Sequence, residues 1–170
     1  MAGPTAGRIL NFGTGLENVS PSVVMQSDYK FLGFLNSSPS ISDNTLTTLS
    51  IEAEIYKTGI THSNVTNPSR ITFTTVGYYW FYFSIAAASN GQTGGTVLTQ
   101  YKINGSTQTL YLSIDACPLA GKGVIVTGGI ALSFAANDYL ELATLQISGA
   151  ARTLTGGSSF IGAFLMPGWA

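Results

Sequence analysis

The stretch GYYWFYFSIAAA, residues 77–88, constrains the fold more than any other part of the chain. Successive side chains of a β-strand point to opposite faces of its sheet. One row here contains Tyr79, Phe81, Phe83 and Ile85, and the opposite row contains Tyr78, Trp80 and Tyr82. An antiparallel strand usually packs one face on the core and turns a polar face to water. Because both rows are aromatic, the stretch indicates a second apolar contact besides the core.

The rest of the chain also has a strand pattern. Short β-branched or aromatic runs, separated by Gly, Asn, Ser and Pro turns, predict strands at 22–26, 29–35, 45–56, 70–76, 78–88, 96–104, 108–114, 123–135, 138–148 and 158–166. Within 45–56 the alternation puts Glu52 and Glu54 on one face and Ile51, Ala53 and Ile55 on the other. No segment keeps an apolar period of 3.6 residues, so we expect an all-β sandwich or barrel.

The first 21 residues differ from the remainder, since small and turn-forming residues surround isolated apolar side chains. We therefore expect an extended N-terminal arm over 1–21 and a single domain over 22–170. The arm is either an unattached terminus or a segment that docks onto a neighbouring subunit or a larger particle. The candidate docking residues are Ile9, Leu10, Phe12 and Leu16.

Charged residues make up 9% of the chain and the formal net charge is −1. A typical soluble domain has about 25% charged residues. The sequence has neither the basic patch of a nucleic-acid-binding protein nor a polybasic segment for anionic lipid, so we expect no nucleic acid and no membrane partner. No apolar run reaches the roughly 20 residues of a membrane-spanning helix, and the start lacks the apolar centre of a secretory signal. We expect synthesis in the cytoplasm and a surface that tolerates close packing in an assembly.

Catalytic and metal-binding patterns are weak in this sequence. His62 is the only histidine and lies in the polar run THSNVTN, which predicts an exposed loop. Cys117, which precedes a proline, is the only cysteine, and a single cysteine excludes an intrachain disulfide. We expect Cys117 to be a small buried side chain. Glu52 and Glu54 are the closest pair of carboxylates, and a metal site there needs a neighbouring loop. We expect no enzyme activity, no metal and no cofactor.

Three motifs occur in an order that is typical of one family. RITFTTVGYYWF contains Gly77, Tyr79 and Phe81 in the pattern G-x-Y-x-F; ANDYLEL contains Asp138, Leu140 and Leu142; SSFIGAFLM contains Phe160, Gly162 and Leu165. Over roughly residues 45–166 the chain resembles the trimeric jelly-roll family of the complement globular head and tumour necrosis factor. It departs from the family at Asn137, where Gly is usual, and at Ile161, where Ser is common. We also expect neither the collagen-like stalk nor the N-terminal membrane anchor of some family members.

The resemblance implies a jelly-roll β-sandwich in which three subunits pack around a threefold axis. Carried over to this chain, it implies that Tyr79, Phe81 and Phe83 fill the sandwich. It also implies a trimer interface made by Tyr78, Trp80 and Tyr82. Burying three large side chains in each protomer contributes on the order of 5 kcal/mol before association entropy is subtracted. The alternative is that a loop or the N-terminal arm covers this face within one chain.

Two functions fit these expectations. The first is a virion structural protein, a trimeric capsid decoration or cement protein of a bacteriophage, whose partners are its own copies and the major capsid protein or another virion component. The second is the receptor- or glycan-binding head of a phage fibre or spike, or of a bacterial surface protein, with Trp169 as a candidate sugar-stacking residue. The third hypothesis is an enzyme that uses His62 or Cys117.

Overall fold

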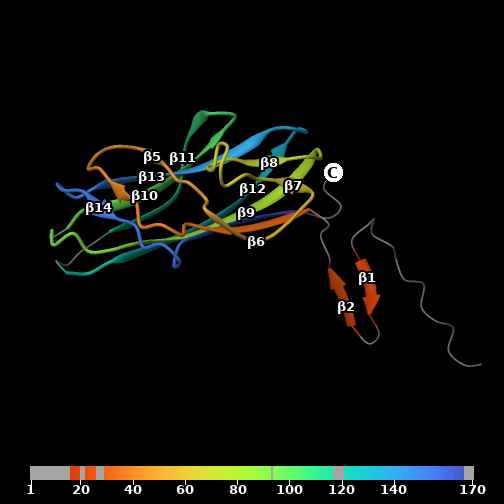
Figure 1. Ribbon diagram of the computed structural model, residues 1–170, viewed down its shortest axis with the longest axis horizontal. Helices are drawn as coiled ribbons and strands as arrows, with labels where there is room; N and C mark the ends of the chain where they lie inside the picture. Colours follow the sequence, from red (N-terminus) through yellow and green to blue (C-terminus); the bar gives the residue numbers. More distant parts are fainter. Residues whose placement is uncertain (1–15, 20–21, 26–28, 93, 117–120, 167–170) are drawn as a thin grey trace, which may run out of the picture.

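The computed structural model describes residues 16–19, 22–25, 29–92, 94–116 and 121–166 of the chain (Figure 1). Over these ranges the regular structure consists of β-strands, without a helix. The strands form two large antiparallel sheets with a core between them. The prediction of an all-β sandwich is therefore confirmed. Within the described ranges there is no helix of the length and apolar character required to cross a bilayer.

The first large sheet has five strands in the order β12-β9-β15-β3-β6. These strands are β12 (Val124–Phe134), β9 (Gly77–Ala87), β15 (Phe160–Leu165), β3 (Lys30–Phe34) and β6 (Ala53–Thr58). The aromatic stretch forms β9, which pairs with β12 on one side and with β15 on the other. Both edges of β9 are therefore hydrogen-bonded, and only its two faces are available for side-chain packing.

The second large sheet has the order β11-β10-β13-β8-β7, with β5 pairing to β13. Its strands are β11 (Ser106–Ala116), β10 (Thr96–Ile103), β13 (Tyr139–Ile147), β8 (Ile71–Phe73), β7 (Ile60–Thr61) and β5 (Thr47–Thr48). A short pair, β4 (Ser40–Ile41) with β14 (Arg152–Thr153), completes the sandwich. The sequence pattern missed β4, β7 and β14, because two residues are too few to show a period.

The core lies between the two large sheets and contains the inward row of β9. Tyr79, Phe81 and Phe83 are buried there. Phe73 of β8 stacks on Phe134 of β12 with ring centroids 4.0 Å apart, so these two rings join the two sheets. Each large side chain that is fully buried contributes about 1.5–3 kcal/mol. The aromatic side chains therefore provide a large share of the sandwich's stability.

The segment 45–56 is not one strand, and this prediction was wrong. Thr47–Thr48 belongs to the six-stranded sheet, and β6 belongs to the five-stranded sheet, so the chain crosses between sheets in the middle of the segment. Leu49 and Ile51 are buried at the crossing. A register shift in the pairing of β3 with β6 follows, and Ile55 is 61% exposed instead of sharing the buried face of Ile51. The crossing breaks the period of two that the sequence showed.

The N-terminal region contains a strand that the sequence analysis did not predict. β1 (Leu16–Val19) pairs with β2 (Ser22–Met25) as a two-stranded antiparallel sheet. Leu16, one of the candidate docking residues, begins β1. The other three, Ile9, Leu10 and Phe12, lie outside the described residues. The division into an arm over 1–21 and a domain over 22–170 stays a prediction.

Candidate functional site

The outward row of β9 lies on the far side of the five-stranded sheet from the core. Tyr78 is 42% exposed and Trp80 is 38% exposed, while Tyr82 is half-buried. Single exposed apolar residues are common on proteins, but adjacent large aromatics on one sheet face form a patch of the kind that marks an interaction site. We call the outward side of the five-stranded sheet the aromatic face. Its role as a trimer interface stays a prediction.

Further rings extend the aromatic face across β15 and β3. The Tyr82 ring centroid is 6.4 Å from that of Phe160 and 6.3 Å from that of Phe164. Phe160 in turn lies 6.3 Å from Phe34, edge to face. These separations are within the range of about 4.5–7 Å at which aromatic pairs attract one another. The face is therefore a packed layer of rings, already held in place within one chain.

Two glycines make this layer possible. A Cβ atom on Gly162 of β15 would overlap the ring of Tyr82, which lies directly over it. A Cβ atom on Gly129 of β12 would lie 2.8 Å from Cζ2 of Trp80, closer than carbon atoms approach without displacement. The missing side chains leave room for the ring of Tyr82 next to β15 and for the ring of Trp80 next to β12. Gly162, which the sequence singled out as a motif residue, thus supports the aromatic face.

One polar group on the aromatic face is a tyrosine hydroxyl. Burial raises the pKa of Tyr82, and a hydrogen bond with Tyr56 of β6 raises it further. Lys30 of β3 lies over the Tyr56 ring, with its Nζ atom 5.8 Å from the ring centroid. Tyr82 therefore stays neutral at physiological pH, and it presents no charge that would oppose an apolar contact.

The remaining motif residues have structural roles. Burial raises the pKa of Tyr79 to about 12, and its hydroxyl donates to the carbonyl oxygen of Thr75 at 2.9 Å. Phe81 and Leu140 are buried in the core, and Gly77 begins β9 opposite Phe134 of β12.

Asp138 closes the turn before β13. One of its carboxylate oxygens accepts from the Asn104 amide at 2.8 Å, and the other accepts from the Ala135 backbone N–H at 2.7 Å. The hydrogen bond from Asn104 lowers the pKa of Asp138 most, and the one from Ala135 lowers it further, so this pKa lies below its ordinary value of 3.8. Asn137 has a φ of 72°, in the left-handed region that glycine adopts most readily and asparagine tolerates. That backbone conformation explains why Asn stands where Gly is usual.

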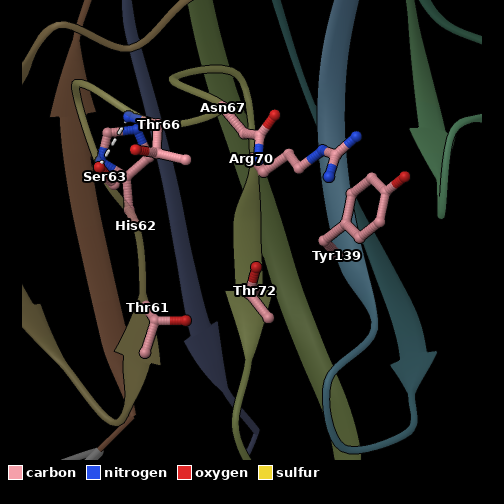
Figure 2. Close-up of a pocket in the computed structure, with 8 residues that line it drawn as sticks. All are labelled: Thr61, His62, Ser63, Thr66, Asn67, Arg70, Thr72 and Tyr139. Atoms are coloured by element: carbon pink, nitrogen blue, oxygen red, sulfur yellow. Dashed lines mark hydrogen bonds between the residues drawn. The ribbon is translucent and has the colours of Figure 1, made fainter.

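A polar cleft lies on the outer side of the other large sheet (Figure 2). Its volume is about 250 Å³. Thr61, Thr72 and Tyr139 are register partners on the adjacent strands β7, β8 and β13, so they form a row across the sheet. The cleft is completed by the loop between β7 and β8, which contributes His62, Ser63, Thr66, Asn67 and Arg70. None of these residues is a carboxylate.

The prediction of an exposed His62 was wrong, because its side chain is buried beside β6. His62 Nδ1 lies 2.6 Å from Glu54 Oε1, and Nε2 lies 3.0 Å from the carbonyl oxygen of Pro68. Lys57 Nζ contacts the same carboxylate at 3.0 Å and donates to the His62 carbonyl oxygen at 2.7 Å. Burial alone would raise the pKa of Glu54, but the hydrogen bonds from His62 and Lys57 outweigh it and lower that pKa. These contacts fix the start of the cleft loop.

Arg70 lies at the other end of the cleft loop, over the ring of Tyr139. Its Cζ atom is 4.2 Å from the ring centroid, a cation–π distance. Nε of Arg70 lies 3.5 Å from Oε1 of Glu141, and the same carboxylate oxygen accepts from Ser69 Oγ at 2.7 Å. The ring and the carboxylate together hold the guanidinium group in one orientation at the edge of the cleft.

The sequence candidates for metal binding are not brought together. Glu52 accepts hydrogen bonds from the backbone and hydroxyl of Ser37, which lower its pKa, whereas Glu54 is bound to His62. The two carboxylates therefore do not share a site. Across the described ranges, no group of three or more His, Cys, Asp or Glu side chains is placed to hold a metal ion. Cys117 and Trp169 lie outside these ranges.

No family model and no curated protein matches the chain, whereas solved structures do. The Eiger TNF of S. frugiperda is 13% identical, with 83% of this chain and 94% of that chain covered and a TM-score of 0.56. The globular domain of zebrafish complement 1qA protein is 13% identical, with 81% and 97% covered and a TM-score of 0.56. Murine APRIL is 12% identical, with 81% and 98% covered and a TM-score of 0.57. The fold is therefore the jelly-roll sandwich of the tumour necrosis factor and complement-head type, as predicted.

Proposed function

We propose that this protein is a non-catalytic head that assembles as a homotrimer through its aromatic face and serves as a structural protein of a virus particle. The observation that carries the proposal is the outward row of β9, in which Tyr78 and Trp80 remain about two-fifths exposed in a single chain. Inward and outward rows are both aromatic, but the core of one chain takes only the inward row. Burial against two other copies is the simplest way to cover the other row.

The geometry of the aromatic face supports self-association over binding of a mobile peptide. Its rings are preorganised by contacts within the chain and by the two glycines beneath them. Preorganised side chains lose little conformational entropy on binding, which favours a stable interface. Tyr82 is neutral and Tyr56 is its hydrogen-bond partner, so these two hydroxyl groups add no charge to a contact between copies.

The role on a particle is supported by composition and by the N-terminal region. A chain with 9% charged residues and a net charge of −1 repels identical neighbours weakly, as dense packing on a shell requires. The candidate docking residues of the arm would contact the major capsid protein or another virion component. In this proposal the protein acts as a decoration or cement protein located in the virion, and buried area at the contacts stabilises the shell.

The copy number of this chain per particle tests the structural role. Quantitative mass spectrometry of purified virions from the source culture should give copies comparable in number to the major shell protein. A few dozen copies or fewer would instead indicate a spike or fibre component, and absence from particles would reject the virion role. Deleting residues 1–20 should weaken binding to the particle, and unchanged binding would reject the docking arm.

The polar cleft favours a second candidate function, a receptor- or glycan-binding head. Hydroxyl, amide and guanidinium groups converge there on the sheet opposite the aromatic face. Such a head would use the same trimer and present its clefts outward. A low copy number together with binding to a purified glycan would favour this candidate over the decoration role.

A further inference from the structure

The cleft beside β7, β8 and β13 lies on the outer side of the six-stranded sheet. Thr72 is at its centre, between the register partners Thr61 and Tyr139. The neighbours of Thr72 in the chain, Ile71 and Phe73, point into the core and are buried. The cleft and the aromatic face are therefore on opposite sheets, and a ligand in the cleft does not compete with trimer formation.

The cleft loop is held in place by its own hydrogen bonds. Ser63 Oγ accepts from the backbone N–H groups of Val65 and Thr66 at 3.3 and 3.0 Å (Figure 2 shows the second contact). The Arg70 backbone N–H donates to the Asn67 carbonyl oxygen at 3.0 Å, and Asn67 has a φ of 53°. Together with the buried contacts of His62, these bonds close both ends of the loop. The polar side chains around the cleft are thus presented by a fixed backbone.

Arg70 is the cation that lines the cleft, and one edge of its guanidinium group is available. Nε lies 3.5 Å from Glu141 Oε1. The planar group lies over the ring of Tyr139 (Figure 2). The Arg70 side chain is 39% exposed, whereas its Nε atom is buried without a hydrogen-bond partner in the described part of the chain, so the accessible donors are the two terminal nitrogens. Two parallel N–H donors in this arrangement match the two oxygens of a carboxylate. Because Nε is buried, a ligand carboxylate would bind at the terminal edge.

The remaining lining groups match a polyhydroxylated ligand. Threonine and serine hydroxyls both donate and accept hydrogen bonds. An asparagine side chain donates through its NH2 group and accepts through its carbonyl oxygen. Thr61, Thr66 and Thr72 provide such hydroxyls, and Asn67 provides the amide. A site with several hydroxyl partners around one arginine selects ligands with several hydroxyls and one carboxylate. We propose that the cleft binds an acidic monosaccharide, either free or as the exposed residue of a glycan.

The size of the cleft agrees with this ligand class. A volume of about 250 Å³ lies just below the range of about 300–1,000 Å³ that is typical of sites for drug-sized ligands, so one sugar ring is the appropriate occupant. The cleft is polar, and binding must displace water from the hydroxyl groups. We expect a dissociation constant on the order of 1 mM for a single sugar, with higher avidity for a trimer on a multivalent glycan. This proposal rests on the second candidate function, to which it gives a site and a ligand class.

Saturation-transfer difference NMR on the full-length protein tests the proposal with two matched probes. Glucuronate and glucose differ at C6, where one has a carboxylate and the other a hydroxymethyl group. Glucuronate should bind at least tenfold more tightly than glucose, because charge-assisted hydrogen bonds are about twice as strong as neutral ones. Equal affinity would overturn the assignment of a carboxylate. Sulfate binding as tightly as glucuronate would overturn the assignment of a sugar.

Three variants locate the binding site. Arg70→Gln should weaken glucuronate binding at least tenfold and leave the weak binding of glucose unchanged. Thr72→Val keeps the shape of the side chain but removes its hydroxyl, so it should weaken both sugars. Lys122→Gln removes an exposed charge at a residue that does not line the cleft, so it should change the affinity for neither sugar. If Arg70→Gln does not fold, Thr72→Val and the probe pair still decide the question. Full affinity in both cleft variants would reject this site, and glycan binding that survives them would retain the second candidate function at another surface.

Discussion

Replacing Trp80 by glutamate should convert the proposed trimer into monomers. Trp80 is 38% exposed in a single chain, which corresponds to about 60–95 Å² for an aromatic side chain of about 150–250 Å². Covering that area contributes about 1.5–2.4 kcal/mol in each protomer. Three protomers lose about 4–7 kcal/mol, and the dissociation constant of the trimer then rises by about three to five orders of magnitude. The three carboxylates, brought together around one axis, repel one another and add to this loss.

Sedimentation equilibrium measures this change directly. The unaltered protein should have three times the chain mass of 17.8 kDa, about 53 kDa, and Trp80→Glu should have the mass of one chain. Val65→Glu is the matched control, since Val65 is 84% exposed on the loop between β7 and β8 and lies away from the aromatic face. The control should remain trimeric. A Trp80→Glu protein that keeps both its fold and the trimer mass would refute the assignment of the interface.

Three further predictions follow from other contacts. Gly162→Ala places a methyl group under the Tyr82 ring and should lower the free energy of unfolding by about 1–3 kcal/mol, measured with urea. Glu54→Gln should destabilise the protein at about pH 7, where the carboxylate is charged and bound to His62. Because the pKa of Glu54 is lowered from 4.5 in the fold, the difference from the unaltered protein should shrink as the pH falls through the folded-state value, and a difference that persists in acid would contradict the argument. Asp138→Ala removes two hydrogen bonds to a carboxylate and should cost about 1–2 kcal/mol at neutral pH, measured by thermal unfolding.

Much of the fold could be predicted from the sequence, because long strands carry a strong period of two. The alternation is kept from Gly77 to Phe83, where β12 pairs with β9 in one continuous register, and the rest of β9 is buried on both faces. The prediction for 45–56 failed for the opposite reason. The chain crosses between sheets near Leu49 and Ile51, and a crossing changes which side faces the core without changing the apolar pattern.

The polar cleft was not predicted, because its parts come together only in the folded sheet. Thr61 and Thr72 are polar residues in short strands, and Tyr139 joins them through the pairing of β13 with β8. His62 looked exposed since its neighbours in the chain are polar, but its partner Glu54 is on β6. One signal was present in the sequence. Arg70 is one of only seven lysine and arginine residues in the chain, and it is the first residue of the predicted strand 70–76.

The mass of the unaltered protein in solution tests the central claim most directly. Sedimentation equilibrium at successive dilutions should give about 53 kDa, three times 17.8 kDa, at every concentration down to the micromolar range. The reason is that an interface made of preorganised rings loses little conformational entropy on association and therefore stays associated on dilution. A mass of 17.8 kDa at these concentrations would contradict the claim. The aromatic face would then have to be covered by another protein or by the chain itself.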